Sequence, residues 1–404
     1  MLRDGWLYGC AGLILTGLIA RNAVVAGLGV ALLIVCAAAV LWSRWSLRRL
    51  TYERYVPEDH AFSGEHLPVT LRITNRKPLP LPWVETRDNV PESLVGERDG
   101  FERGHIGVNT LSFDWRTAVG AYERVSRELS LDCPARGVYR LGPVTVRSGD
   151  PFGFFPSERS DDRRTNVVVY PRTVDPGDLQ LPWRRPLGEN QHGLTEFEDP
   201  GRVAGNRDYR PGDSLRRIDW NATARLGKLQ SRVYLPTSSL QLLICLNTQT
   251  VVPAWSGYVA ENLEHAVIVA ASIAHDAYDH RYAVGLVANG SMPDADRSIR
   301  IAPGRRPEQF IRMLEALAVI TPFVLEPLAT VLDREEHRLR IGTTVVVLTS
   351  VMPDDLASTL LRLRRRGHQV VVFSVAGERW SDVLGDLPVE DVSRLGRISN
   401  EAPS

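Results

Sequence analysis

The sequence has few cysteines and no net charge. Only four cysteines occur among the 404 residues, at Cys10, Cys36, Cys133 and Cys245, and no two of them form a C-x-x-C pair. This spacing fits neither a disulfide framework nor a zinc site, and it indicates buried, reduced thiols in a reducing compartment. Lys+Arg and Asp+Glu are equal at 48 each. The balance argues against nucleic-acid binding, because phosphate recognition normally needs a basic surplus.

Catalytic motifs are missing as well. The pair Gly227-Lys228 is followed by leucine and lacks the upstream glycine of a phosphate-binding loop, and neither a G-x-S-x-G nor an H-E-x-x-H motif occurs. His265, His275 and His280 are ten and five residues apart, which does not stack them as a metal pair on a helix. We therefore expect no enzyme activity and no cofactor. An unrecognised hydrolase, whose nucleophile and base meet only in the folded chain, stays open as an alternative.

Two apolar runs, Trp6–Ala20 and Ala23–Trp42, begin the chain and are separated only by Arg21 and Asn22. The second run is long enough to cross a bilayer as a helix, and the first is slightly short. We expect a transmembrane helical hairpin over residues 1–45. A cleaved signal peptide is the alternative, but the second run would still anchor the chain.

Basic residues flank the downstream end of the second run, whereas the turn between the runs offers only Arg21. The downstream arginines are Arg44, Arg48, Arg49 and Arg54. Positive residues stay in the cytoplasm. We therefore expect both ends of the hairpin, and everything after residue 50, to lie on the cytoplasmic side of the inner membrane. Trp6, Trp42 and Trp45 occupy the places where interfacial aromatic anchors belong.

Residues 50–180 show short strand patterns instead of a helical period. Leu67, Val69, Leu71 and Ile73 alternate with polar or turn-forming residues, which is typical of a half-buried strand. Prolines recur through the segment and restrict helices. This pattern predicts an antiparallel β-sandwich. Such a module usually binds a partner or acts as a spacer between domains.

Residues 181–237 form a charged connector in which arginines alternate with aspartates and two aromatic residues. Planar guanidinium groups beside carboxylates suit bidentate pairing, which can fix a backbone path that has little apolar core. The structural interpretation is a salt-bridged connector that positions the β-sandwich against the next domain. The functional interpretation is a docking surface for a charged partner. The residues singled out are Arg207, Asp208, Tyr209, Arg210, Pro211, Gly212, Asp213, Arg217, Asp219, Trp220 and Arg225.

Residues 238–380 alternate between strand and helix, and residues 381–404 form a tail. The apolar runs at 240–246, 282–288, 343–348 and 369–375 predict buried strands, and helical spacing appears at 258–280, 307–320 and 354–366. This order predicts a doubly wound parallel sheet in a Rossmann-like α/β domain. Any site is then expected at the carboxyl ends of the strands.

Three motifs together resemble the bacterial membrane proteins grouped as domain of unknown function 58. They are the stretch Ala135–Pro143, the stretch Asp150–Gly153, and above all the run from Arg207 through Asp219-Trp220 to Arg225. The resemblance spans nearly the whole chain. It implies a transmembrane hairpin, a β-sandwich and a von Willebrand factor A-like α/β domain. It also implies an accessory role beside a MoxR-type AAA+ ATPase.

One departure from von Willebrand A domains concerns the metal. Their D-x-S-x-S motif after the first strand helps to hold Mg²⁺, but the matching positions here are Asn247, Gln249 and Val251. A neutral amide, a longer amide and an apolar side chain replace the carboxylate and the two hydroxyls. We expect no competent metal site, since a hard dication needs anionic oxygen ligands.

These features favour a non-enzymatic, membrane-anchored scaffold. Its α/β domain would present the loops near Asn247–Ser256 and Thr349–Asp355 to a protein partner, for which the resemblance suggests an AAA+ ATPase. A metal-dependent adhesion receptor is the second hypothesis. It would need the body outside the cell and a working Mg²⁺ site, and the flanking arginines and Asn247 oppose both.

Overall fold

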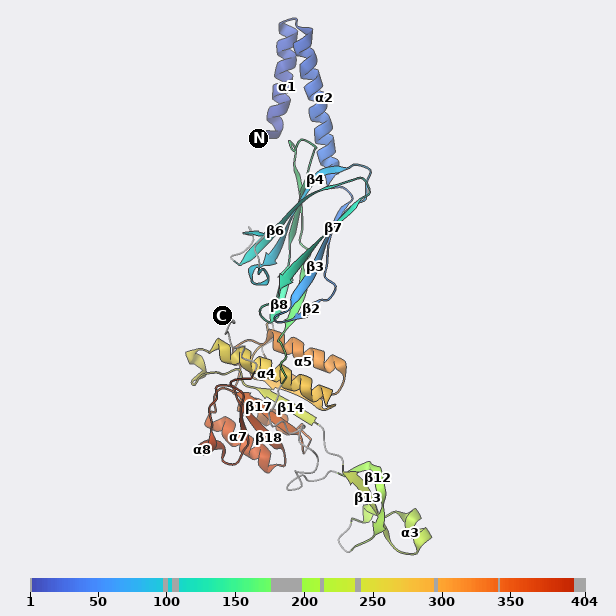
Figure 1. Ribbon diagram of the computed structural model, residues 1–404, viewed down its shortest axis with the longest axis vertical. Helices are drawn as coiled ribbons and strands as arrows, with labels where there is room; N and C mark the ends of the chain where they lie inside the picture. Colours follow the sequence, from blue (N-terminus) through green and yellow to red (C-terminus); the bar gives the residue numbers. More distant parts are fainter. Residues whose placement is uncertain are drawn as a thin grey trace, which may run out of the picture. The chain divides into compact units, whose positions relative to one another are not determined.

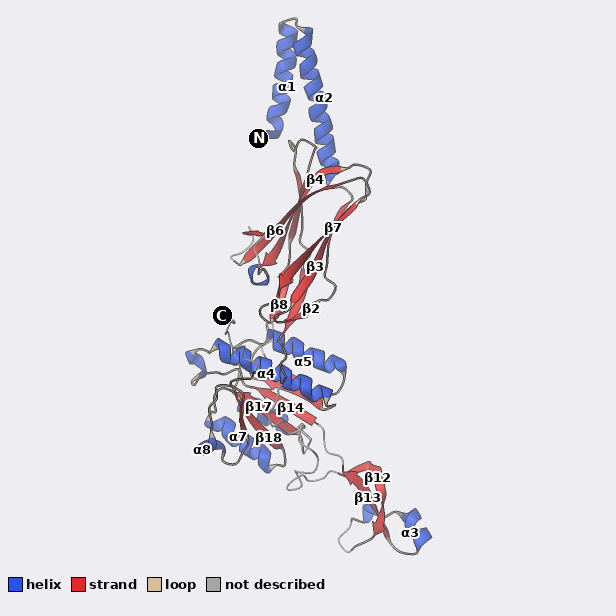
Figure 2. Cartoon of the chain, in the orientation of Figure 1, coloured by secondary structure: helices blue, strands red, loops and turns tan. Residues whose placement is uncertain are grey.

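The computed structural model describes residues 2–96, 101–103, 109–175, 198–210, 214–236, 241–293, 297–340 and 342–395. The chain divides into two compact units, Met1–Tyr170 and Pro171–Ser404. The first unit contains two long helices and a β-rich part, whereas the second contains a mixed α/β domain (Figures 1 and 2). At this coarse level the predicted fold class is confirmed.

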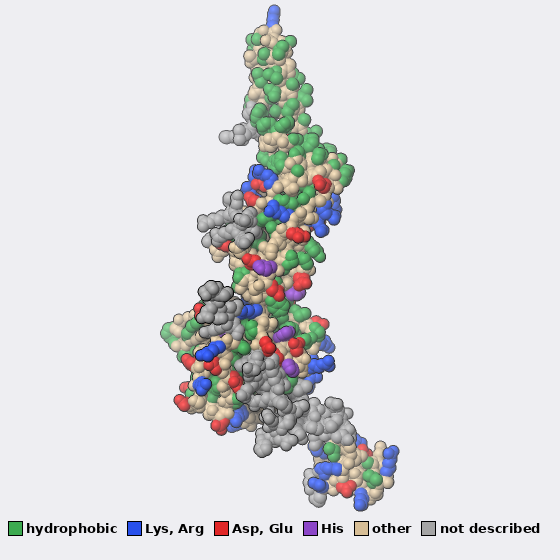
Figure 3. Space-filling view, viewed as in Figure 1, with side chains coloured by type: hydrophobic (Ala, Val, Ile, Leu, Met, Phe, Trp, Pro, Cys, Tyr) green, Lys and Arg blue, Asp and Glu red, His purple; other side chains and the backbone are tan. Residues whose placement is uncertain are grey.

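Helices α1 (Leu2–Ile19) and α2 (Ala23–Ser46) follow the two apolar runs. The turn ends at Asn22, whose side chain accepts hydrogen bonds from the first backbone amides of α2 and so caps the helix. Among the described residues, α2 is the one helix long and apolar enough to cross a membrane, and the apolar part of α1 is confined to Tyr8–Ile19. Apolar side chains cover both helices (Figure 3).

Two glycines allow α1 and α2 to pack closely against each other. A Cβ added at Gly17 would come within 2.4 Å of the Ala26 backbone nitrogen, and one added at Gly29 within 2.7 Å of the Ile14 side chain. Cys10 of α1 and Cys36 of α2 are both buried and are neighbours in the same interface. A larger side chain at Gly17 would therefore force the helices apart.

The β-rich part of the first unit contains three sheets, with strand orders β1-β3-β7, β10-β9-β4-β6-β5 and β2-β11-β8. All neighbouring strands are antiparallel except β2 and β11, which are parallel. The strands are β1 (Leu50–Tyr55), β2 (His60–Phe62), β3 (His66–Asn75), β4 (Leu81–Pro91), β5 (Phe101–Arg103), β6 (Thr110–Val119), β7 (Arg124–Asp132), β8 (Gly137–Leu141), β9 (Val144–Ser148), β10 (Ser157–Asp161) and β11 (Thr165–Tyr170).

One hydrophobic core joins these sheets. The alternation read from the sequence is confirmed in β3, where Leu67, Val69, Leu71 and Ile73 are all buried in this core. A buried ion pair lies beside it: Arg54 binds both carboxylate oxygens of Asp88, and the two side chains are 5% and 2% exposed. The Tyr52 hydroxyl donates to the same carboxylate at 2.6 Å.

The second unit begins with a small antiparallel hairpin, β12 (Glu198–Asp208) and β13 (Gln230–Pro236). Between these strands lie a short 3₁₀ helix, Leu215–Arg217, and helix α3 (Trp220–Leu226). We call residues 198–236 the signature hairpin. It contains most of the connector residues singled out in the sequence.

The α/β domain is built on one six-stranded sheet with the order β16-β15-β14-β17-β18-β19. The strands are β14 (Gln241–Leu246), β15 (Ala283–Ala288), β16 (Ile299–Gly304), β17 (Thr344–Thr349), β18 (Gln369–Ser374) and β19 (Val389–Asp391). Neighbours are parallel except β16, which is antiparallel to β15. The four strands predicted from the sequence, β14, β15, β17 and β18, are parallel as expected, whereas the antiparallel edge strand β16 was not predicted. The described residues between β15 and β16 contain no helix, and β16 pairs antiparallel with β15.

Helices cover both faces of the sheet. Helices α4 (Ala260–Asp279) and α5 (Pro307–Val319) contact each other and strands β14 to β16 on one face. Helices α6 (Leu328–Glu336) and α7 (Asp354–Arg365) pack on the other face against alternate residues of β14, β17 and β18. The short α8 (Ser381–Leu384) follows. Helices α4, α5 and α7 confirm the predicted segments to within a few residues, whereas α6 was not predicted.

Candidate functional site

The carboxyl edge of the six-stranded sheet is the place where this fold can form a site. From β14 the chain crosses through α4 to β15 on one side, and it later returns to β17 on the other side of β14. Such a switch point opens a crevice outside the carboxyl ends of the strands. The residues that follow β14, β15 and β17 therefore define the candidate site.

A hydrogen-bond network of neutral side chains fills this edge. The Asn247 amide nitrogen donates to the Thr349 hydroxyl at 3.0 Å, and the Asn247 oxygen accepts from the Asn289 amide at 2.9 Å and from the Gln249 backbone amide at 3.1 Å. The Asn289 oxygen in turn accepts from the Thr248 backbone amide at 2.8 Å. Asn247, Thr248, Asn289 and Thr349 are at most 3% exposed. We call these four residues the edge network.

The chemistry of the edge network does not suit a metal ion. Its members are amides and hydroxyls that already bind one another, while Gln249 turns its amide to the Val251 carbonyl at 3.0 Å. Among the described residues, no group of three or more His, Cys, Asp or Glu side chains is placed to hold an ion. A hard dication would have to displace several buried hydrogen bonds without gaining an anionic ligand.

Two loops that leave this edge carry exposed apolar side chains. After β14, Trp255 is 87% exposed and Tyr258 is 54% exposed. The second loop carries Phe323 at 72% and Leu325 at 43% exposure, and its backbone pairs with the end of β15 through Leu325 to Asn289 at 3.1 Å. The edge network thus fixes the bases of loops that present aromatic rings to solvent, as protein-binding surfaces do.

Hydrogen bonds more than apolar packing hold the signature hairpin together. Asp208 accepts from the Gln230 side chain at 2.6 Å. Asp219 caps α3 by accepting from the backbone amides of Asn221 and Ala222, both at 3.1 Å, and its other oxygen accepts from Arg232 at 3.1 Å. The Ala222 amide and then the Arg232 guanidinium hold the pKa of Asp219 below its ordinary value. The predicted charged pairing thus brings Asp219 to Arg232, a residue that sequence reasoning missed.

Other signature residues lie on the hairpin surface. Trp220 is 67% exposed, Arg225 is exposed, and the Tyr209 backbone amide donates to the Leu229 carbonyl at 2.9 Å. Arg207, Arg210 and Arg217 also lie on this hairpin. Pro211, Gly212 and Asp213 lie outside the described residues. The hairpin and the edge network are separate candidate surfaces.

Cys133, His265 and His280 are buried or hydrogen-bonded within the fold. Cys133 is 1% exposed, and burial raises the pKa of its thiol, which makes it a poor nucleophile. The His265 Nε2 lies 2.7 Å from the Val392 carbonyl, and the His280 Nδ1 lies 2.7 Å from the Asp276 carbonyl. These contacts fit structural side chains.

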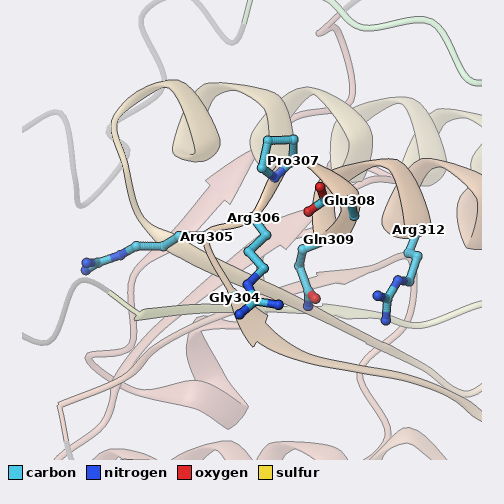
Figure 4. Close-up of a pocket in the computed structure, with 7 residues that line it drawn as sticks. All are labelled: Gly304, Arg305, Arg306, Pro307, Glu308, Gln309 and Arg312. Carbon is cyan, nitrogen blue, oxygen red and sulfur yellow. The ribbon is translucent and has the colours of Figure 1, made fainter.

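An open depression of about 770 Å³ lies where β16 joins α5. Its lining includes Arg305, Arg306 and Arg312 together with Glu308 (Figure 4). Arg305 points away from the other two arginines (Figure 4). Exposed guanidinium groups at a helix N-terminus attract anions, but water and salt screen them strongly.

Three members of the edge network, Asn247, Thr248 and Thr349, lie in the two loops singled out from the sequence, whereas Asn289 was missed. Asn289 follows β15 in a stretch without a recognised motif, and its role depends on the pairing of β15 with β14. A polar residue directly after each predicted buried strand was the available signal, and Asn289 and Thr349 both carry it.

Together these features define a class of protein: an apolar N-terminal helix, a β-rich unit, and an α/β domain whose carboxyl edge is closed by neutral side chains. Residues 205–398 match the family model described as "Protein of unknown function DUF58". This match covers the α/β domain and part of the signature hairpin, and it confirms the family resemblance seen in the sequence.

A curated relative is the uncharacterized protein YeaD of Bacillus subtilis (strain 168). The two chains are 24% identical over 346 residues, which cover 84% of this chain and 79% of YeaD. Among solved structures, the CARDB domain of the PF1109 protein from Pyrococcus furiosus matches 30% of this chain and 86% of its own, with 16% identity and a TM-score of 0.21. A cohesin module from Clostridium perfringens matches 31% of this chain and 97% of its own, with 12% identity and a TM-score of 0.21. Scores this low carry no argument about the fold.

Proposed function

We propose that this protein is a non-enzymatic scaffold, held in the inner membrane by α1 and α2, that presents the carboxyl edge of its α/β domain to a cytoplasmic protein partner. The length and apolar composition of α2 support the anchor. Arg44, Arg48 and Arg49 are exposed at the downstream end of α2, and such residues remain on the cytoplasmic side.

The proposal takes α1 and α2 as a transmembrane hairpin. Close packing at Gly17 and Gly29 supports this, because helices in lipid associate through small residues. The Thr16 hydroxyl donates to the Gly12 carbonyl at 2.7 Å and so needs no partner from water. We further take the three sheets of the first unit as a sandwich that acts as a spacer, and the α/β domain as a von Willebrand A-like domain without a metal.

The exposure of Trp255 carries the binding part of the proposal. A tryptophan 87% exposed on a loop whose base is fixed by buried hydrogen bonds has no role in the core. The Thr250 hydroxyl accepts from the Val259 backbone amide at 2.7 Å and closes this loop. Aromatic residues on preformed loops dominate the binding energy of many protein interfaces. The partner we propose is a MoxR-type AAA+ ATPase.

The test measures binding of the full chain in lipid nanodiscs to a purified MoxR-type ATPase from the same organism. We expect saturable binding that Trp255→Ala weakens about tenfold or more, the usual cost of losing an interfacial tryptophan. Tyr55→Ala, at a 54% exposed aromatic residue on β1, is the matched control and should bind like the wild type.

Trp220→Ala separates the two candidate surfaces, because Trp220 lies on the signature hairpin. Weaker binding for Trp220→Ala together with unchanged binding for Trp255→Ala would move the docking surface to that hairpin. Absence of binding with the wild-type chain would refute the ATPase partnership.

A further inference from the structure

The loop that joins β9 to β10 presents two phenylalanine rings to solvent. It has the sequence Asp-Pro-Phe-Gly-Phe-Phe over Asp150–Phe155, and we call it the Phe152 loop. Phe152 is 66% exposed and Phe154 is 50% exposed, whereas Phe155 is buried. The rings of Phe152 and Phe154 stack with centroids 5.8 Å apart. Two adjacent apolar rings in water are unfavourable unless another surface covers them.

Asp150 holds this loop in one conformation. It is fully buried, and its carboxylate accepts from the backbone amides of Phe155 at 2.6 Å and Phe152 at 3.0 Å. Its carbonyl accepts from the Trp83 indole at 2.9 Å. The two exposed rings are therefore presented by a preorganised turn, so little ordering free energy is lost when they are covered.

The Phe152 loop lies beside the apolar helices of its own unit. The Phe154 ring centroid is 5.1 Å from that of Trp6 on α1. Ser157, the first residue of β10, contacts Ser43 of α2 with hydroxyl oxygens 2.9 Å apart. Arg159, two residues further along β10, donates to the Leu50 carbonyl at 2.7 Å. The loop thus extends from β10 back along the helices, toward their apolar part.

The end of α2, which β10 contacts through Ser43 and Ser157, carries exposed basic residues. Arg44, Arg48 and Arg49 are exposed at the end of α2, and the exposed Arg76 donates its backbone amide to the Arg49 carbonyl at 3.0 Å. The Arg48 guanidinium lies 5.7 Å from the Trp45 ring centroid. Aromatic rings flanked by arginines match the boundary between acyl chains and anionic headgroups of a bilayer.

We propose that the Phe152 loop inserts into the headgroup–acyl boundary of the cytoplasmic leaflet, so that the β-rich unit binds anionic lipid directly. This inference rests on the proposed membrane anchoring by α1 and α2. The contact of Phe154 with Trp6 and the exposed arginines at the end of α2 favour lipid over a protein partner, which would have to share this surface with the bilayer. The loop then fixes the orientation of the β-rich unit on the membrane.

Spin-label accessibility tests the proposal on the full chain in nanodiscs of phosphatidylethanolamine and phosphatidylglycerol. Single cysteines replace Phe152 in the loop, Ile34 in α2, and Val138 in β8, with Cys10 and Cys36 changed to alanine. Ile34 is 62% exposed and Val138 is 44% exposed, so all three sites accept a label. Figure 1 shows β8 at the end of the first unit opposite α1 and α2, which makes Val138 the aqueous control. The measured quantity is the ratio of collision rates with oxygen and with a water-soluble nickel chelate.

We expect the ratio of the oxygen collision rate to the nickel-chelate collision rate to be highest at Ile34. The ratio at Phe152 should be several-fold higher than the ratio at Val138. Equal ratios at Phe152 and Val138, with a high ratio at Ile34, would refute the loop insertion and leave the anchor intact. A low ratio at Ile34 would refute the anchor itself. A Phe152 label shielded from both reagents would mean that protein covers the loop, and this also overturns the proposal. Labelling at Phe154 repeats the test if the first label disturbs the turn.

Discussion

Replacing Asn247 by aspartate tests whether the carboxyl edge is a neutral structural network. Asn247→Asp keeps the oxygen that accepts from Gln249 and Asn289, but the second oxygen then faces the Thr349 hydroxyl oxygen. That hydroxyl already donates to the Val351 carbonyl at 2.5 Å. The new carboxylate would be nearly buried with no cation beside it, so burial should raise its pKa.

The expected loss follows from that pKa. A rise of about 2 above the ordinary pKa near 3.9 costs about 2.7 kcal/mol of stability at any pH above both the unfolded-state and the folded-state pKa. At a pH below the pKa that this aspartate has in the unfolded chain, the substitution lowers the free energy of unfolding only slightly, because the carboxyl is protonated in both states. The destabilisation then grows with pH by about 1.4 kcal/mol per pH unit until the folded pKa is passed.

Hydrogen exchange measured by mass spectrometry suits this test, because peptides covering β14 and β17 report the opening of the α/β domain alone. Compared with the wild type, Asn247→Asp should speed exchange of these strands about 100-fold near pH 7.5, and much less near pH 4. Asn221→Asp, the same change at an exposed position of α3, is the control and should leave β14 unchanged.

Two results would refute the reasoning. Wild-type protection of β14 in Asn247→Asp at neutral pH would mean that the site tolerates a carboxylate. Recovery of protection in millimolar Mg²⁺ would mean that the edge supplies metal ligands, which would favour the metal-dependent receptor.

Three further predictions concern the first unit. Asp88→Asn should lower the free energy of unfolding of this unit by about 3–5 kcal/mol, because the buried Arg54 loses its counter-charge. Hydrogen exchange of the strands of this unit measures the change. The control Asp161→Asn, at an exposed ion pair, should change the free energy of unfolding by less than about 0.5 kcal/mol. Burial lowers the pKa of Lys77 to about 8, and methyl-lysine NMR on isotope-labelled protein should give that midpoint. The folded state therefore releases a proton that the unfolded state keeps, so the contribution of Lys77 to stability should rise with pH from about 8 to 10. Gly17→Leu should abolish oxidative cross-linking of the cysteines in α1 and α2, whereas Gly12→Leu, where an added Cβ meets nothing within 4 Å, should leave it unchanged.

Local sequence patterns were sufficient for most helices and strands. Apolar runs without polar interruption gave β14 and β17, because a strand buried on both faces needs no alternation, and the length of the apolar run at Ala23–Trp42 gave α2. The alternation of apolar and polar residues in β3 gave its buried face, because one side of that strand faces the core and the other side faces solvent. The family motif in the signature hairpin was also readable from the sequence.

Long-range pairing decided the rest. The antiparallel direction of β16 depends on its pairing with β15, and the sequence of Ile299–Gly304 carries no signal for that direction. Asn289 becomes part of the edge network only because β15 lies beside β14. In the sequence, Asp150–Gly153 was only one of the motifs that carry the family resemblance, and the contact between Phe154 and Trp6 is what places the Phe152 loop beside the apolar helices. Side chains far apart in sequence have no local pattern that records their meeting, so tertiary structure alone reveals these sites.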